Sequence, residues 1–468
     1  MTHVERLADF ADRASFDSLS TNTREQIKIR ILDSLGCALG ALAAGPTKIV
    51  RKYVDDLGTP GSCTLIGGGR ARPDYAAFYN AALVRYLDFN DSYLAKGETC
   101  HPSDNLGVCL ASGEYADASG RELMAALATA YQVQCRLSDE APVRAKGFDH
   151  TVQGAYAATA AAGKLLRLEA YQLANAIAIS ATALNALRVT RTGVLSNWKG
   201  LAYPHTAADC FRNALLARYG ITGPLEVVEG NKGFIDSIAG PFDVNWASEN
   251  LDRVTRTTLK KYNAEIHSQT AIEAALQLRR EHPIRPGEID RIDLTTFDVA
   301  YNIIGGGEEG NKSTVRTKEQ ADHSLPYLIS VALLDGQVMP EQYASDRILR
   351  PDVQTLMKKV SVHPDASYSA RFPDEMPACV AIALGDGQMI EREVSNCEGS
   401  CSLPMDRNAT YRKFEILSAP VTNEAQRKAI ADMVFDLENH TVTDLMALLR
   451  GTASQPVGTK VVVSIGRR

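Results

Sequence analysis

The sequence predicts a mainly α-helical protein, in which a large all-helical domain is joined to a smaller α+β domain. Three observations lead to this prediction. Apolar residues recur at helical spacing, with many alanines, through residues 1–264. Short β-prone runs bounded by glycine and proline appear in residues 265–402. Helical spacing returns in residues 403–468, which we expect to pack back on the first domain.

The helices of the first domain are predicted from amphipathic and alanine-rich stretches. In "NTREQIKIRILDSLGCALGAL", Ile27, Ile31, Leu35 and Leu39 fall at helical spacing after the candidate cap Ser20. The stretches "GRELMAALATAYQVQCRL" and "QGAYAATAAAGKLLRL" continue the pattern. Small side chains let helices approach closely, so we expect a large bundle over residues 1 to about 260.

The α+β domain is predicted from three strand-like runs and one helix. Ile292 and Leu294 alternate in "HPIRPGEIDRIDLTTF", and "KKVSVHPD" predicts a second short strand. The run "ACVAIALGDGQMIEREV" predicts a hairpin that turns at Gly385-Asp386-Gly387. Between these runs, "ADHSLPYLISVALLDG" predicts a helix.

Composition excludes several classes of protein. Apolar residues make up 45% and charged residues 23% of the 468 residues, which is typical of globular proteins. The net charge of −6 argues against nucleic acid or an anionic membrane surface as a partner. The least charged long run, Ala170–Leu187, contains Gln, Asn, Ser and Thr and predicts a buried helix rather than a membrane span. The start of the chain has no signal-peptide pattern, so we expect a cytoplasmic protein.

Cysteines and glycine runs give no sign of a metal or a nucleotide. The nine cysteines are scattered without a C-x-x-C pair, and the nearest two are Cys397 and Cys401. We therefore expect reduced thiols and no metal. The runs "IGGGRARP" and "IIGGGEEGNKS" do not have phosphate-binding spacing, and Glu308 and Glu309 in the second would repel phosphate. Both runs predict turns or mobile loops.

The segment most suggestive of chemistry is "YLDFNDSYLAKGETCHPSDNLG", residues 86–107. It gathers Asp88, Asp91, Ser92 and His101 in a short turn-rich stretch, and Pro102 stiffens the backbone after the histidine. Taken alone, the segment is better explained as a polar helix end with an Asn/Asp/Ser turn.

Four further segments place ionisable side chains beside rigid elements. The ordinary alternative for His150 is a capping or solvent-facing histidine. For the segment of Arg191 it is a solvated basic patch, whereas the functional interpretation is a carboxylate clamp. The residues are His150 in "KGFDHTVQG", Arg188, Arg191 and Lys199 in "ALRVTRTGVLSNWKG", Lys260, Lys261 and His267 in "TLKKYNAEIHSQT", and His323 and Tyr327 in "ADHSLPYLIS".

The sequence resembles the MmgE/PrpD family over essentially the full chain. The motifs that carry the resemblance are "YLDFNDSYLAKGETCHPSDNLG", "SNWKG" and "ADHSLPYLISVALLDG". That family includes 2-methylcitrate dehydratase and cis-aconitate decarboxylase. The resemblance implies an all-helical domain, an α+β lid with the active site in the cleft between them, a homodimer and no required cofactor.

The resemblance also implies which residues act. It places the site at Asp88, Ser92, His101, His150, Lys199, Lys260 and Tyr327. By their chemistry, Asp88, His101 and His150 can transfer protons, Ser92 and Tyr327 can donate hydrogen bonds, and Lys199 and Lys260 can hold carboxylates. These lysines are expected to lie outside the core. Dehydrating a hydroxy-tricarboxylate needs a base, an acid and cations for the developing charge, and this set supplies all three.

The segment "SYLAKGETC" departs from the methylcitrate dehydratases, so Lys96 and Glu98 stand where the substrate could differ. The expected reaction is dehydration of 2-methylcitrate or a related citrate. A decarboxylase or an epimerase of small amino-dicarboxylates on the same scaffold, and a helical binding protein, remain alternatives.

Overall fold

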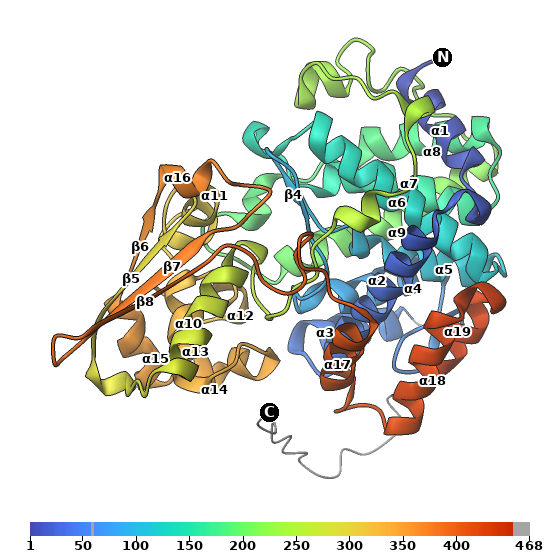
Figure 1. Cartoon of the computed structure of the whole chain (residues 1–468). Coiled ribbons are helices and arrows are strands. Elements are labelled where there is room, and N and C mark those ends of the chain that lie inside the picture. The colour runs from blue at the N-terminus through green and yellow to red at the C-terminus, as the bar shows by residue number, and fades with distance from the viewer. Residues whose placement is uncertain (58–59, 453–468) are drawn as a thin grey trace.

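The computed structural model describes residues 1–57 and 60–452. Figure 1 shows two bodies side by side, a large helical body and a smaller body built on a sheet. This confirms the predicted fold class, mainly α with a smaller α+β part.

The helical body contains the N-terminal helices, two short hairpins and the last three helices. Its helices are α1 (His3–Arg13), α2 (Thr21–Gly40), α3 (Gly45–Asp56), α4 (Pro73–Tyr86), α5 (Leu106–Tyr115), α6 (Gly120–Glu140), α7 (Thr151–Leu165), α8 (Ala170–Ala183), α9 (Trp198–Arg218), α17 (Arg407–Ser418), α18 (Glu424–Phe435) and α19 (Val442–Arg450). Its strands are β1 (Cys63–Thr64), β2 (Arg70–Ala71), β3 (Tyr93–Leu94) and β4 (Thr99–Cys100).

Capping and small residues explain why these segments are helices and why they pack closely. Ser20 caps α2 by accepting a hydrogen bond from the backbone of Thr23, as the sequence predicts. Between α4 and α5, a Cβ on Gly107 would lie only 2.4 Å from the backbone nitrogen of Ala81, so the contact requires glycine. The alanine-rich α7 is buried along almost its entire length.

The prediction of helix up to residue 260 is wrong for the stretch after α9. Residues 219–260 form turns, short 3-10 segments and one π-helical turn, Ile235–Ala239. Five glycines and two prolines fall between residues 220 and 241, which breaks any continuous helix. The stretch still covers the helical core through buried side chains such as Trp246 and Val254.

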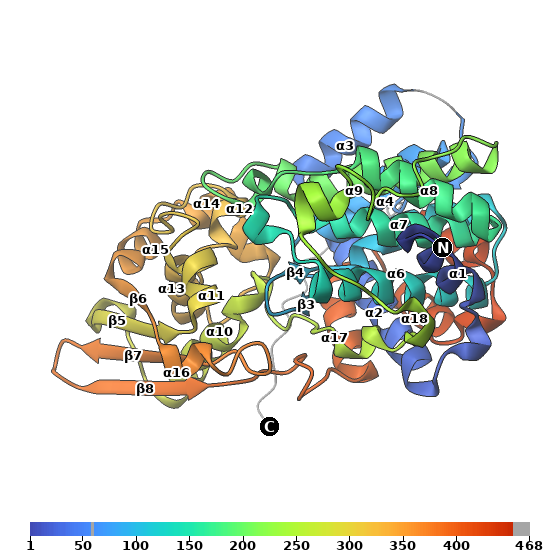
Figure 2. The same ribbon diagram turned by 90° about the horizontal axis from the view of Figure 1, so that it is seen from above.

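The α+β body is a four-stranded sheet with helices packed on it (Figure 2). The strand order is β6-β5-β7-β8, with β5 and β6 parallel and the other pairs antiparallel. Its strands are β5 (Ile289–Thr296), β6 (Val360–Pro364), β7 (Ala378–Leu384) and β8 (Met389–Val394). Its helices are α10 (Gln269–Glu281), α11 (Asp298–Ala300), α12 (Lys318–Ala321), α13 (Leu325–Asp335), α14 (Ser345–Ile348), α15 (Pro351–Leu356) and α16 (Ala366–Ser369).

Each body has its own apolar core, and the chain passes from one to the other and back. One cluster of buried side chains runs from Val4 to Val254 and resumes from Phe414 to Leu449. A second cluster runs from Tyr262 to Val394. Helix α17 lies against α2, where a Cβ on Gly36 would approach Phe414 to 3.1 Å. The predicted tail continues to residue 468, and its last part lies outside the described residues.

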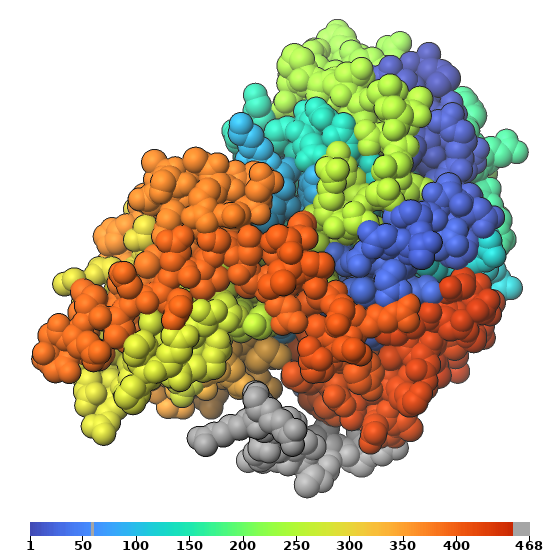
Figure 3. All heavy atoms as spheres, in the orientation of Figure 1, coloured from blue at the N-terminus to red at the C-terminus, as the bar shows by residue number. Residues whose placement is uncertain are grey.

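The two bodies meet along a polar junction. Figure 3 shows them in contact, with the segment after β8 running across the junction. There the backbone N–H of Leu259 donates to the carbonyl of Gly399 at 2.9 Å. Lys318 of α12 donates to the backbone carbonyl of Tyr86 at the end of α4. Among residues 1–57 and 60–452, none of the helices could span a membrane.

Candidate active site

A small cavity lies between the two bodies and receives ionisable side chains from both. Its volume is about 40 Å³, and a wider outer cavity of about 420 Å³ shares part of its wall. The inner cavity is lined by Arg85, Asp88, Glu98, Thr99, His101, Arg144, His150, Arg188, Arg191 and Lys260 from the helical body and the segment after it, and by Glu265, His267, Ile303, Glu309 and His323.

The segment between α4 and α5 folds back on itself, and so places Asp88 and His101 in the same cavity. Strands β3 and β4 pair antiparallel, with Tyr93 opposite Cys100, which brings Ser92 next to His101. The backbones of Ser92 and Thr258 also exchange two hydrogen bonds, in each of which one residue's N–H donates to the other's carbonyl. These bonds position the backbone that leads to Lys260. The result is a rigid hairpin rather than the polar helix end that the sequence also allowed.

His101 is held in one tautomer with its other nitrogen free. Its Nδ1 lies 2.8 Å from the backbone carbonyl of Asp91, which can only accept, so Nδ1 carries the proton. Ser92 Oγ lies 3.0 Å from the same nitrogen. Burial, together with Arg85 and Lys260, lowers the pKa of His101 well below its usual value. Nε2 of a neutral imidazole, without a hydrogen-bond partner among the described residues, is therefore available as a base.

His150 lies beside His101 at the start of α7. The two rings meet edge to face with centroids 5.3 Å apart, and the ring of Tyr203 also stacks with that of His150. Burial lowers the pKa of His150 to about 3, so the ring is neutral. Neither ring nitrogen has a hydrogen-bond partner in the part of the chain that the structure describes. A ligand with a polar group would satisfy one of them.

Asp88 is a buried carboxylate surrounded by cations. Its backbone has a φ of 55°, a left-handed conformation that is uncommon outside glycine. Arg85 donates to Oδ1 at 2.5 Å, Lys260 to the same oxygen at 2.9 Å, and Lys199 to Oδ2 at 3.0 Å. Burial alone would raise the pKa of Asp88, but these cations lower it well below the usual value. The carboxylate is therefore ionised and serves to position cations, not to transfer protons as expected from the sequence.

Lys199 does not line the inner cavity, and the expectation that it lies outside the core is wrong. Its side chain is 3% exposed. Its Nζ lies 3.0 Å from Asp88, 3.2 Å from Asp322 and 3.1 Å from Nδ1 of His323. The ammonium group donates to one carboxylate from each body, so Lys199 joins the helical body to α12 and the residues that follow it.

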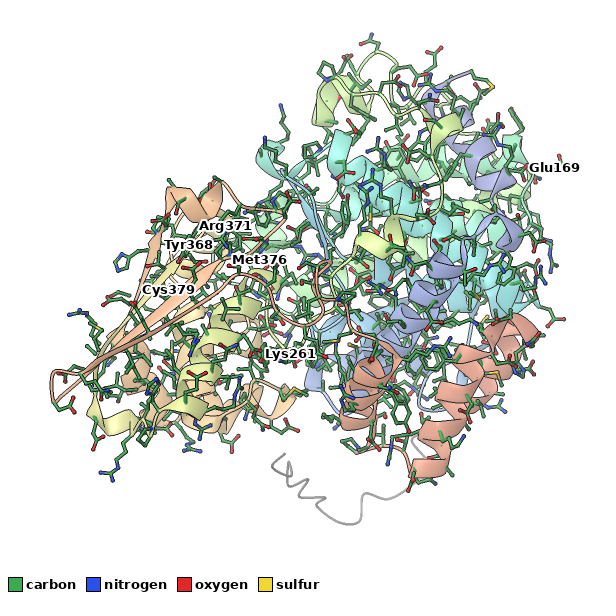
Figure 4. The ribbon with its side chains drawn as sticks, viewed as in Figure 1. Glu169, Lys261, Tyr368, Arg371, Met376 and Cys379 are labelled. Carbon is green, nitrogen blue, oxygen red and sulfur yellow. The ribbon has the colours of Figure 1, made fainter. Side chains whose placement is uncertain are left out.

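Lys260 is fully buried as well, but it does reach the cavity. Its Nζ donates to the carbonyl and to a carboxylate oxygen of Asp88, which leaves one of its three N–H bonds for a ligand. Lys261, the next residue, turns away to Glu273 at 2.8 Å and lies where the two bodies meet (Figure 4).

The arginines of the predicted clamp are already paired. Arg191 donates to both oxygens of Asp149, at 2.5 and 3.3 Å. Arg188 and Arg144 both donate to Glu309, at 2.6 and 3.2 Å. A carboxylate ligand would find cations here only by exchanging with these partners.

Tyr327 lies away from the cavity. It is buried in the core of the α+β body, and its hydroxyl donates to the backbone carbonyl of Gln342. His323, one helical turn earlier, does line the cavity. Its Nδ1 lies 2.8 Å from Asp322, and burial together with Lys199 lowers its pKa.

Several cavity residues have no clear signal in the sequence. They are Arg85, Glu98, Arg144, Glu265 and Glu309. Arg85 and Glu309 look like surface charges, one near a helix end and one in a glycine-rich loop. The only sequence signal at Glu98 is the departure of its segment from the methylcitrate dehydratases. Burial raises its pKa, and Oε2 accepts from the backbone nitrogens of Val143 and Arg144.

Asp88, Asp322 and His323 offer the ligand atoms of a metal site, but the ammonium group of Lys199 lies between them. Ligand atoms of Asp88, Asp322 and His323 lie within 4.8 Å of one another. The Nζ of Lys199 lies between 3.0 and 3.2 Å from one atom of each. The ammonium group therefore occupies the position a cation would take, and these residues do not fit a metal ion.

The chain is thus a two-body, mainly helical protein. The cavity between its bodies holds two neutral histidines, His101 and His150. Sequence models of the MmgE/PrpD N-terminal domain and the MmgE/PrpD C-terminal domain match residues 5–247 and 262–438. The chain belongs to the MmgE/PrpD family.

The curated relatives are named for one of two activities, dehydration or decarboxylation. The 2-methylcitrate dehydratase of Escherichia coli (strain K12) is 27% identical, over 76% of this chain and 76% of its own. The 2-methylcitrate dehydratase of Cupriavidus necator is 28% identical, over 77% and 78%. The cis-aconitate decarboxylase of Mus musculus is 26% identical, over 98% of this chain and 95% of its own.

Proposed function

We propose that this protein is a lyase that dehydrates 2-methylcitrate, or a related citrate, to the corresponding cis-aconitate without a cofactor. The observation that carries the proposal is the unpaired Nε2 of His101 in a cavity lined with arginines and a lysine. Family membership and the names of the relatives support the reaction class.

Proton transfer follows from the tautomer of His101. Nε2 takes the proton from the carbon next to a substrate carboxylate, and the developing negative charge spreads into that carboxylate. The C–O bond on the neighbouring carbon then breaks, a double bond forms, and the departing hydroxide takes the proton from the imidazolium to leave as water. His101 returns to its neutral state, and no oxidant or second reactant is needed.

Fixed charges stabilise the intermediate. Lys260 lines the cavity and has one N–H not used by Asp88. Asp88, which is held by Arg85 and both lysines, favours the imidazolium form of His101. His150, with two unpartnered nitrogens, is placed to bind the substrate hydroxyl.

The direct experiment is an assay of the purified protein with citrate, 2-methylcitrate and longer 2-alkylcitrates. A rise in ultraviolet absorbance from the conjugated product is expected with 2-methylcitrate or a close homologue. No rise with any of these compounds would contradict the proposal.

Decarboxylation of cis-aconitate is the second candidate. The observation in its favour is the mouse decarboxylase, which aligns over nearly the full length of both chains. Carbon dioxide release from cis-aconitate, measured in the same preparation, separates the two reactions. An epimerase of small amino-dicarboxylates would instead exchange the substrate α-proton with solvent and release neither product.

A further inference from the structure

Glu309 binds two cavity arginines across the junction between the bodies. Its Oε1 accepts from Arg188 at 2.6 Å and from Arg144 at 3.2 Å. Glu309 lies in the loop after the π-helical turn Tyr301–Gly305 of the α+β body, and both arginines belong to the helical body. Charge-assisted hydrogen bonds of this kind are what arginine also forms with the carboxylates of ligands.

The ion pairs of Glu309 are incomplete. Oε1 accepts both hydrogen bonds, whereas Oε2 is buried and has no partner among the described residues. Nε of Arg188 is also buried without a partner. Such groups carry an uncompensated desolvation cost, so a ligand carboxylate that satisfied both arginines more fully could replace Glu309.

The loop geometry fixes where the carboxylate lies. Gly306 and Gly310 have φ values of 108° and 92°, which favour glycine, and the backbone N–H of Glu309 donates to the carbonyl of Asn302 at 2.9 Å. The turn presents Glu309 as a buried side chain, while its neighbour Glu308 is exposed.

Glu309 stands between the two cavities. Together with Arg144 and Arg188 it lines both the inner cavity of about 40 Å³ and the outer one of about 420 Å³. The inner volume holds one or two waters, whereas ligand sites usually span roughly 300–1,000 Å³. A substrate must therefore enlarge the inner cavity, and the ion pairs of Glu309 lie on the shared wall.

We propose that Glu309 occupies the position of a substrate carboxylate and competes with it for Arg144 and Arg188. A ligand binds fully only if it brings a carboxylate to replace Glu309. The residue thereby selects polycarboxylates over ligands with a single charge and weakens the binding of all anions. The inference rests on the polycarboxylate substrate class proposed above, but not on the reaction.

Binding of tricarballylate, measured by calorimetry, tests the inference without turnover, since this tricarboxylate has no hydroxyl group to lose. Glu309→Gln should lower its dissociation constant about tenfold, because the two arginines lose their internal partner. Glu341→Gln is the control, since it removes the same charge from an exposed site of the α+β body outside both cavities, and should change the constant less than twofold.

The other outcomes are equally decisive. Unchanged or weaker binding to Glu309→Gln would overturn the inference and show that Glu309 positions the arginines instead. If circular dichroism shows that Glu309→Gln does not fold, Glu309→Asp replaces it, with a gain of about threefold expected from the shorter reach of the carboxylate. No binding to any of the proteins would contradict the polycarboxylate class itself, whereas binding without dehydration would contradict only the proposed reaction.

Discussion

The ammonium nitrogen of Lys199 lies 3.0 Å from a carboxylate oxygen of Asp88, although 111 residues separate the two along the chain. Both side chains are almost completely buried. The same nitrogen lies 3.2 Å from Asp322, which belongs to the other body. One cation thus binds carboxylates from both bodies, outside the lining of the inner cavity.

Replacing Lys199 with methionine should lower the free energy of unfolding by about 1–3 kcal/mol, because Asp88 and Asp322 each lose one buried hydrogen bond. The loss stays in this range because Asp88 keeps Arg85 and Lys260, and Asp322 keeps Lys318. Urea unfolding followed by circular dichroism measures the effect. Lys428→Met is the control, because Lys428 is exposed and pairs with Asp432 on the surface. Equal stability of the two variants would show that the buried ion pairs contribute nothing specific.

His101→Gln should reduce kcat by roughly 10²- to 10⁴-fold, the usual effect of losing one general base. The unfolding midpoint should stay close to that of the wild type, since glutamine can keep a hydrogen bond to the Asp91 carbonyl. His205→Gln, at an exposed position of α9, serves as the control and should retain activity. A fully active His101→Gln would exclude the residue as the base.

Stability should fall as the pH drops below about 7, in part because of His150. Its pKa is about 3 in the folded chain and near 6.5 when unfolded, so between pH 7.5 and 5 only the unfolded chain gains a proton there. This linkage costs about 2 kcal/mol over the interval. Between these pH values, the free energy of unfolding of His150→Phe should therefore fall by about 2 kcal/mol less than that of the wild type. The exposed variant His205→Phe should show the wild-type loss, and an identical loss in His150→Phe would contradict the neutral, buried state.

Activity should survive prolonged treatment with a chelator and purification without iron. The cluster of Asp88, Asp322 and His323 is occupied by an ammonium group, and the cysteines lack the spacing of a cluster site. Turnover before and after dialysis against EDTA is the measurement. Loss of activity that a divalent metal restores would refute this prediction.

The chain should form a homodimer through the segment before α9. Leu187, Val189, Val194 and Trp198 are 46–86% exposed within a dozen residues, which is unusual for a surface that stays in water. Light scattering after gel filtration should give twice the monomer mass, and Val194→Lys combined with Val189→Lys should shift it to the monomer. Ile49→Lys, at an exposed site on α3, should not. A monomeric wild type would contradict the prediction.

Secondary structure that depends on residues close together along the chain could be predicted from the sequence. The hairpin of β7 and β8 turns at Gly385-Asp386-Gly387, and α13 begins after Ser324 within the predicted helix. The segment around His101 was predicted to be the site, and the structure places Asp88, His101, His150, Arg191 and Lys260 on one cavity.

Side-chain direction and pairing were not predictable, because they depend on contacts between distant segments. Tyr327 lies one turn after His323 but faces the core of the α+β body. Lys199 resembled a surface cation because its three partners come from two other segments. Glu309 looked like part of a mobile loop, since its arginine partners lie more than 100 residues away.

The placement of α17 against α2 also orders events during synthesis. The α+β core is formed by one continuous stretch, Tyr262 to Val394, so it can fold as soon as that stretch has left the ribosome. The helical core lacks Phe414 and the helices after it until the last residues are made. The face of α2 that packs against α17 is therefore uncovered while the second body folds, and exposed apolar surface of this kind makes a nascent chain prone to aggregation.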